Sequence, residues 1–383
     1  MRDVLREAYA WYLAGESVGL ATVVSTFRSA PRPAGAAMAV SQSGAVVGSV
    51  SGGCVEADVY EEARQAQATG RPVLRRYGVS DQDAFAVGLS CGGEIEVFVE
   101  PLSRRTFPEL PMLMASLASA EPVATATVVA DANAGAGTPG RRLVIWPDRT
   151  AGSLGSAALD GTVTVDARGL LEHGTSVLTH YGRAGQRQGE EVAVFVGSFA
   201  PAPRLLVFGA LDFAAAVAEL GTYLGYRVTV CDARPVFATT ARLPHADEVV
   251  VRWPHEYLAE EAAAGRLDDR TVLAVLTHDP KFDVPLLATA LRLPRLAYVG
   301  ALGSRATQRD RLVRLREAGL NEEELSRLAA PAGLDLGART PQETAVSILA
   351  EVIATRWGGS GRRLTATAGR IHRAGQADEG SAF

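Results

Sequence analysis

The sequence has 383 residues, of which 47% are hydrophobic and 21% charged, and its formal net charge is -5 at pH 7. This length predicts two or three domains, and the composition is that of a globular protein rather than a disordered chain. The negative charge argues against a nucleic-acid partner bound through a large basic face.

Three cysteines, Cys54, Cys91 and Cys231, occur without a CxxC spacing. An odd number at this spacing is neither a disulfide framework nor a set of zinc ligands, so we expect no metal site. The first residues lack the apolar core of a signal peptide, and no apolar run reaches the roughly 18 residues that span a bilayer. We therefore expect a cytoplasmic protein without a membrane partner.

Residues 1–200 predict an N-terminal α+β domain. Its apolar spacing favours helices over 3–14 and 56–68, and its β-branched runs favour strands over 18–27, 73–77, 94–100, 123–130, 142–146, 176–180 and 192–196, with two short strands around a turn at 41–44. No internal repeat is evident in the sequence.

Residues 201–358 predict a second domain of a different class. The segment Pro201-Ala202-Pro203 is a stiff boundary, because two prolines restrict the backbone and remove two donors. Helical stretches then separate most of a series of short apolar strands, at 205–208, 227–231, 248–251, 272–276 and 296–299. This alternation is typical of βαβ units, so the fold class is α/β, with a Rossmann-like parallel sheet in the second domain.

The last helix has a clear start signal. Thr340 is placed as the N-cap, Pro341 takes the first helical position, and Glu343 completes a capping box. The helix is expected to dock through an apolar face made of Ala345, Ile348, Leu349, Val352 and Ile353. The tail, residues 359–383, is rich in Gly, Ser and Arg and is expected to be mobile.

The first candidate for ligand binding is Ser51-Gly52-Gly53-Cys54, where a strand turns into a helix. Gly52 and Gly53 would let backbone N–H groups approach a ligand, and a helix N-terminus would lower the pKa of the Cys54 thiol. Glu56 and Asp58 in the first turn oppose a second negative charge. The alternative is a small buried cysteine behind a tight turn.

A near mirror image of this segment follows at Ser90-Cys91-Gly92-Gly93. Two cysteines flanked by Gly-Gly within about a hundred residues are unusual. Either both loops face one ligand, with Cys91, Gly92 and Gly93 contributing to it, or the glycines allow two backbones to pack closely.

The loop from Arg28 to Gly35 carries two arginines, Arg28 and Arg32, held by Pro31 and Pro33. A guanidinium is well shaped to bind phosphate. Arg32 is therefore a candidate ligand-binding residue, and a solvated surface arginine is the alternative.

The turn after the first strand of the second domain reads Gly209-Ala210-Leu211-Asp212. A dinucleotide site needs a glycine where Leu211 stands, because the backbone approaches the pyrophosphate there. Asp232 closes the second strand, where a ribose-binding acid belongs. NAD(P) binding is therefore disfavoured, although Asp232 remains a candidate.

Two further loops are expected at the carboxyl ends of parallel strands, where α/β sheets bind ligands. The turn Gly303-Ser304-Arg305 opens a helix and offers backbone donors and a guanidinium to a phosphate. His278 with Asp279 is a candidate acid–base pair, and a structural histidine at a strand end is the alternative.

Together these stretches resemble the XdhC/CoxI family, the accessory factors of xanthine dehydrogenase and carbon monoxide dehydrogenase maturation. The matching segments are APRPAGA (30–36), GSVSGGCVE (48–56), SCGG (90–93), YVG (298–300), GSR (303–305), PAGLDLGA (331–338) and TPQE (340–343). The family's Rossmann turn usually reads Gly-Ala-Gly-His, which differs from Gly209-Ala210-Leu211-Asp212 here.

The resemblance implies an accessory factor rather than an enzyme. Such a factor binds molybdenum cofactor of the molybdopterin type, presents it to a cysteine desulfurase for sulfuration and delivers it to an apo molybdenum hydroxylase of the xanthine or CO dehydrogenase type. A homodimer is left open. Two alternatives come from other classes: an NAD(P)-dependent oxidoreductase that uses the second domain, and a docking scaffold that holds no cofactor.

Overall fold

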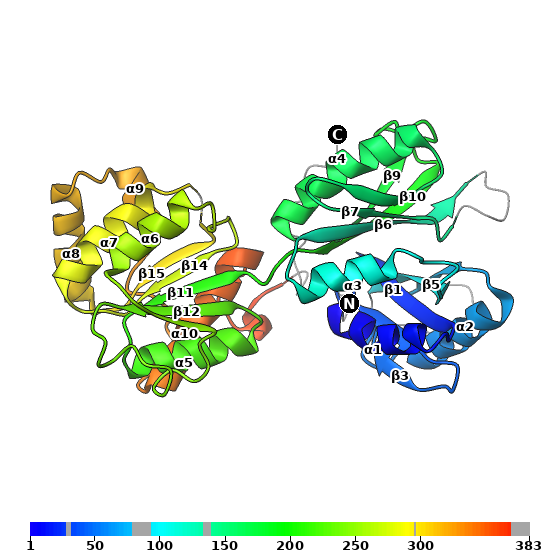
Figure 1. Cartoon of the computed structure of the whole chain (residues 1–383). Helices are drawn as coiled ribbons and strands as arrows, with labels where there is room; N and C mark the ends of the chain where they lie inside the picture. The colour runs from blue at the N-terminus through cyan, green and yellow to red at the C-terminus, as the bar shows by residue number, and fades with distance from the viewer. Residues whose placement is uncertain (28–31, 79–92, 133–138, 295, 369–383) are drawn as a thin grey trace. The chain divides into compact units, whose positions relative to one another are not determined.

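The computed structural model of the chain describes residues 1–27, 32–78, 93–132, 139–294 and 296–368. It divides into two compact units between Pro201 and Ala202 (Figure 1). Two antiparallel sheets build the first unit and one parallel sheet builds the second. This agrees with the predicted fold class, an α+β part followed by a Rossmann-like part.

The first unit contains four helices and ten strands among the described residues. In chain order they are α1 (Arg2–Leu13), β1 (Val18–Phe27), β2 (Ala37–Val40), β3 (Val46–Gly48), α2 (Glu56–Thr69), β4 (Val73–Tyr77), β5 (Glu94–Leu102), α3 (Leu110–Ala118), β6 (Val123–Asp131), β7 (Arg142–Ile145), β8 (Thr150–Ser153), α4 (Ala157–His173), β9 (Val177–Tyr181) and β10 (Val192–Phe199).

These elements form the same seven-element unit twice. The strand orders, β3-β2-β1-β5-β4 and β8-β7-β6-β10-β9, correspond strand for strand. The register corresponds as well, because Thr22 lies opposite Ala37 in the first repeat and Thr127 lies opposite Arg142 in the second. The expectation of no internal repeat was wrong, because the two units share topology and register. Many of their corresponding side chains differ, so the repeat is not evident in the sequence.

Helices cover both sheets of the first unit. Helix α2 packs on one face of the first sheet, and α4 packs on one face of the second. The other two helices, α1 and α3, share a core with the opposite faces of both sheets. The sequence missed α3, β8 and α4. Two glycines, Gly161 and Gly169, lower the intrinsic helix propensity of α4, which instead buries Leu159, Val163 and Ala167.

The second unit is a six-stranded parallel sheet with the order β13-β12-β11-β14-β15-β16. Its elements are β11 (Arg204–Phe208), α5 (Asp212–Tyr223), β12 (Arg227–Asp232), β13 (Glu248–Val251), α6 (Pro254–Ala263), β14 (Val272–Val275), α7 (Pro280–Arg292), β15 (Tyr298–Ala301), α8 (Arg305–Glu317), α9 (Glu322–Ser326), β16 (Leu328–Ala329), α10 (Pro341–Trp357) and a 3-10 turn, η1 (Leu364–Ala366). Helices α5 and α10 pack on one face of this sheet, and α6, α7 and α8 pack on the other.

The strand order reverses between β11 and β14, which places a crevice at their carboxyl ends. Helix α10 begins as predicted, because Thr340 accepts from the Glu343 N–H and the Glu343 carboxylate accepts from the Thr340 N–H. The predicted apolar face of α10 was wrong at one residue. Ile353 is 45% exposed and so does not pack on the sheet.

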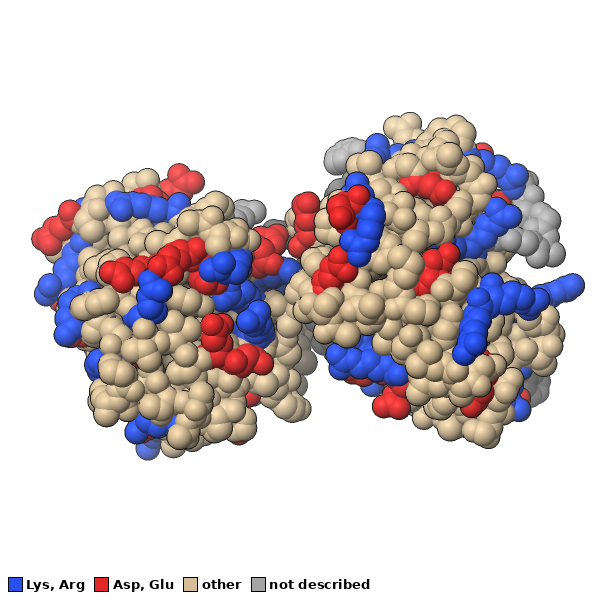
Figure 2. Space-filling view, in the orientation of Figure 1, with Lys and Arg blue, Asp and Glu red and all other residues tan. Residues whose placement is uncertain are grey.

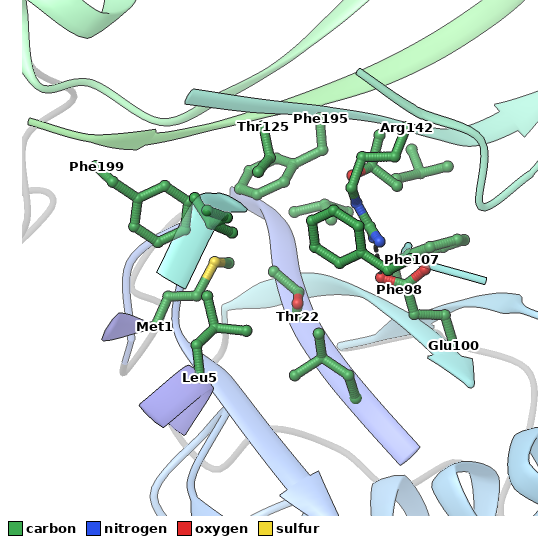
Figure 3. A pocket seen from close by; sticks show the side chains of 15 residues that line it. Met1, Leu5, Thr22, Phe98, Glu100, Phe107, Thr125, Arg142, Phe195 and Phe199 are labelled. Carbon is green, nitrogen blue, oxygen red and sulfur yellow. Dashed lines mark hydrogen bonds and ion pairs between the residues drawn. The ribbon is translucent and has the colours of Figure 1, made fainter. Parts of the chain in front are cut away.

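A buried ion pair joins the two repeats of the first unit. Arg142, on β7, donates to Glu100, on β5, and each side chain is 7% exposed. Arg142 also donates to the Thr127 hydroxyl at 3.0 Å, and its guanidinium lies 4.2 Å from the ring centroid of Phe107 (Figure 3). Burial raises the pKa of Glu100, although Arg142 opposes the shift.

We expect Arg142→Met to lower the free energy of unfolding of the first unit by about 3–5 kcal/mol, because it leaves a buried carboxylate without its partner. Calorimetric and urea unfolding would measure the loss. Glu100→Leu in the same chain should restore most of it. Arg6→Ala is the control, because Arg6 meets Asp3 only at the surface. A single variant as stable as the wild type would contradict the expectation.

Candidate functional site

In the first sheet, the ends of β1 and β4 lie beside the start of β5, at one end of the sheet. Strands β1 and β5 are antiparallel, with Phe27 opposite Glu94, and β4 pairs with β5 with Tyr77 opposite Ile95. Both β1 and β4 therefore end where β5 begins. The motif loops that follow β1 and β4 leave the sheet at this end.

The Cys54 loop starts at the same end. It follows β3, and the Ser49 N–H donates to the carbonyl of Ala37, the first residue of β2, at 3.0 Å. Gly93 is buried directly before β5. The other two members of the second motif, Cys91 and Gly92, lie outside the described residues. The topology thus brings the stretch that carries Cys54 to the same end of the sheet as the two ends of the segment that carries Cys91.

A single carboxylate organises the Cys54 loop. Glu56, the first residue of α2, accepts six hydrogen bonds, from the hydroxyls of Ser49 (2.7 Å) and Ser51 (2.5 Å) and from the N–H groups of Val50 (3.2 Å), Ser51 (2.8 Å), Gly52 (2.8 Å) and Gly53 (2.7 Å). Partial burial alone would raise the pKa of Glu56. The hydrogen bonds from Ser51, Ser49 and the loop amides outweigh burial and hold its pKa well below the usual range.

This arrangement changes the role expected for the two glycines. The N–H groups of Gly52 and Gly53 donate to Glu56, so the loop itself uses the donors that the sequence assigned to a ligand. Both glycines have positive φ, and a Cβ on either would meet nothing within 4 Å. The glycines therefore give the loop its conformation and leave open space beside it. Cys54 is half-buried against the core beneath α2.

The second repeat provides an internal comparison. Asp160 stands in α4 where Glu56 stands in α2, and it accepts from Ser153 Oγ and from the Leu154 N–H, both at 2.7 Å. Ser156-Ala157-Ala158 takes the place of Gly52-Gly53-Cys54. The carboxylate that ties the loop is thus common to the fold, whereas the glycines and the thiol are specific to the first repeat.

Arg32, also predicted as a site residue, is exposed and lines a cleft of about 340 Å³ in the first unit. Basic and acidic side chains are interspersed on the face drawn in Figure 2. Within the described ranges, no group of three or more His, Cys, Asp or Glu side chains is arranged to hold a metal ion.

In the second unit, Asp232 is used inside the fold. Its carboxylate accepts from the Ala210 N–H at 2.9 Å and from Arg234, whose guanidinium lies 2.7 Å away. Burial would raise the pKa of Asp232, but the hydrogen bonds from Arg234 and the Ala210 amide lower it. The carboxylate therefore joins the ends of β11 and β12, and its oxygens have partners other than a ribose.

The turn after β11 packs closely against the residues that follow β14. Gly209 has a φ of +107°, and a Cβ there would lie 3.1 Å from Thr277 Cγ2. Leu211 is the N-cap residue of α5 and is exposed.

The thiol of Cys231 lies at the end of β12, next to Asp232. Burial is the main reason that the pKa of Cys231 rises to about 12, and the negative charge of Asp232 adds to the rise.

The predicted pair of His278 and Asp279 is not formed. Asp279 is the N-cap of α7, where it accepts from the Lys281 N–H at 3.1 Å and pairs with the Lys281 ammonium at 3.2 Å. His278 is exposed next to it. Asp279 thus stabilises the helix start rather than orienting His278.

Ser304 likewise caps a helix. Its hydroxyl accepts from the Thr307 N–H at 3.1 Å at the start of α8, and Arg305 is exposed as the first helical residue. Gly303 has a φ of +150°, which favours glycine at this turn. The structure thus places the three residues at the carboxyl end of β15.

The sequence missed a buried network below these loops. Arg311 pairs with Asp283 at 3.1 Å and donates to the Leu302 carbonyl at 2.9 Å. Thr277 donates to the other oxygen of Asp283. The network fixes the loops after β14 and β15 relative to each other. Its hydrogen-bonded pairs are 6 to 28 residues apart in the chain, so no local pattern indicates them.

Sequence models of known families match most of the chain. The model described as XdhC and CoxI family matches residues 11–78 and 116–182, which are corresponding parts of the two repeats, and the model of the XdhC Rossmann domain matches residues 205–352. This chain belongs to the XdhC and CoxI family. None of the helices in the described ranges has both the length and the apolar composition of a membrane span.

Two relatives match nearly the whole of this XdhC and CoxI family chain. It is 28% identical over 343 residues to a probable xanthine dehydrogenase subunit from Bacillus subtilis (strain 168), covering 89% of this chain and 94% of the relative. It is 29% identical over 355 residues to the molybdenum cofactor insertion chaperone PaoD of Escherichia coli (strain K12), covering 93% and 88%. A crystal structure of a xanthine dehydrogenase from Bacillus halodurans shares the fold, with a TM-score of 0.68, 22% identity and coverage of 95% and 97%.

We expect Glu56→Gln to destabilise the first unit by on the order of 2 kcal/mol at pH 7, because an amide accepts the loop donors poorly. The pKa of Glu56 is lowered in the folded state, so its stabilisation is present above the ordinary pKa of about 4.5 and is lost as pH falls. Urea unfolding between pH 7 and pH 3 should show the gap closing. Glu61→Gln, on the same helix and exposed, should leave stability unchanged. A gap that stays constant with pH would refute this role.

Proposed function

We propose that this chain binds molybdenum cofactor and delivers it to a molybdenum hydroxylase of the xanthine dehydrogenase type. The observation that carries the proposal is the convergence, at one end of the first sheet, of the Cys54 loop and the two ends of the segment that holds Cys91. The name of the Escherichia coli relative, a molybdenum cofactor insertion chaperone, supports the same role.

The chemistry of this end of the sheet suits such a cargo. Molybdenum cofactor is anionic through its phosphate and oxygen-sensitive at its dithiolene. Cys54 offers a thiol beside open space at Gly52 and Gly53, and Arg32 offers a guanidinium. Glu56 holds the loop in place before the cofactor arrives, so little ordering is needed on binding. We further propose that a cysteine desulfurase sulfurates the bound cofactor before transfer.

The first test concerns Cys54. We expect Cys54→Ser to keep a near-normal melting temperature, because the change is nearly isosteric, and to lose at least tenfold in retention of released cofactor loaded anaerobically. Pterin fluorescence after gel filtration would measure retention.

Cys231→Ala is the matched control for the Cys54 test, because Cys231 is buried within β12 and should affect only stability. A Cys54→Ser protein that retains cofactor and activates an apo-hydroxylase at the wild-type rate would remove Cys54 from the site.

The second test concerns nucleotides. Leu211 stands where a pyrophosphate would need a glycine, and Asp232 is already paired with Arg234. We therefore expect calorimetry to detect no NAD(H) or NADP(H) binding tighter than about 1 mM, which corresponds to roughly -4 kcal/mol. Leu211→Gly tests separately whether the Leu211 side chain is what blocks the nucleotide. A low-micromolar dissociation constant for the wild type would favour an oxidoreductase.

A further inference from the structure

A cleft of about 340 Å³ lies in the first unit, where its two repeats meet. The stretch Arg32–Ala36, between β1 and β2, forms one side. Ser176, just before β9, and Gly197–Phe199, in β10, form the other, and Met1 and Arg2 complete it. Its volume is at the small end of the range for ligand sites in proteins.

The cleft is open because the two repeats differ at two matched positions: Glu100 and Arg142 on one side correspond to Gly197 and Ala37 on the other. In the first repeat Glu100 lies opposite Leu20, and in the second Gly197 lies opposite Thr125, the equivalent of Leu20. The side chains of Glu100 and its partner Arg142 occupy the space between the two repeats on one side. Gly197 puts none on the other side, so that side remains open.

The glycines of the two connecting loops show the same relation. A Cβ on Gly35 would lie 3.7 Å from the Ser176 hydroxyl, whereas a Cβ on the equivalent Gly140 would lie 3.6 Å from Pro72 and 3.9 Å from a carboxylate oxygen of Glu100. Ser176 and Pro72 each precede the corresponding strand. A carboxylate therefore borders one loop, and a small hydroxyl borders the other.

The lining is basic. It contains two arginines, Arg2 and Arg32, and none of its residues is acidic. Arg2 is anchored by donating to the carbonyl of Ala200, and Arg32 is exposed. The Ser198 N–H donates to the Ser176 hydroxyl at 3.0 Å, which fixes that hydroxyl in the cleft wall. Two guanidinium groups beside small polar residues suit an anion with several oxygens.

We infer that this cleft binds the terminal phosphate monoester of the pterin cargo, with Arg32 and Arg2 as the charged ligands. The inference rests on the proposed function. The Ser49 N–H donates to the carbonyl of Ala37, next to Ala36 in the cleft lining, so the Cys54 loop begins beside the cleft. Phosphate in the cleft would leave the rest of the pterin free to extend toward Cys54.

The test compares two fluorescent probes: the oxidised pterin that retains its phosphate monoester, and the same pterin after phosphatase treatment. We expect wild-type protein to bind the phosphorylated form at least tenfold more tightly. Arg32→Ala should abolish this preference without changing the melting temperature, and Arg32→Lys should restore part of it. Arg6→Ala is the matched control, because Arg6 is an exposed arginine on the same helix as Arg2 and does not line the cleft.

Calorimetry with inorganic pyrophosphate tests the cleft without any pterin. Equal binding of both pterins would overturn the cleft assignment and leave the proposed function standing. If neither pterin binds, the proposed function fails. The assignment of the cleft to the pterin phosphate then fails with it, and pyrophosphate that binds wild type and Arg6→Ala but not Arg32→Ala would show that the cleft still binds phosphate groups. Pyrophosphate binding that is absent or insensitive to Arg32 would overturn the cleft as an anion site altogether.

Discussion

The Cys54 loop depends on the Glu56 carboxylate. Four consecutive backbone amides, from Val50 to Gly53, donate to this one side chain, so the carboxylate holds the loop in its observed conformation. An anion held by amides at the start of a helix is stabilised by both the hydrogen bonds and the helix dipole. The protein therefore uses these loop amides within its own fold, so they are not available as donors to a ligand.

Differences between the two repeats create both candidate features of the first unit. Where the second repeat has Ser156-Ala157-Ala158, the first has two glycines and Cys54. Glu100 and Arg142 fill the space between the two repeats on one side, whereas Gly197 leaves a cleft on the other. The shared fold supplies the framework in both cases, and changes at a few positions supply the chemistry.

Much of this fold is predictable from the sequence, because its strands are short and apolar and α10 carries its own capping box. The repeat is not predictable in this way, since it is a correspondence of register: Ala37 in one repeat is matched by Arg142 in the other. The failure at α4 is similar. Packing of Val163 and Ala167 holds that helix despite its glycines, and packing is not a local property.

The candidate site was predictable only in part, because sequence patterns give neither the direction of a hydrogen bond nor its partner. Spacing correctly put Gly52 and Gly53 in a turn before a helix, but it could not show that Glu56 takes their amides. In the second unit, Asp232 is likewise committed to Ala210 and Arg234.

The same physical rule explains both cases. A partly or fully buried carboxylate must find donors within its own fold, and the nearest donors are the amides of the turn beside it. An acidic residue next to a glycine turn is therefore as much a sign of a closed turn as of a ligand site. In this chain the carboxylates take the turn amides, so the proposed contacts to the cargo come from side chains instead: the thiol of Cys54 and the guanidinium of Arg32.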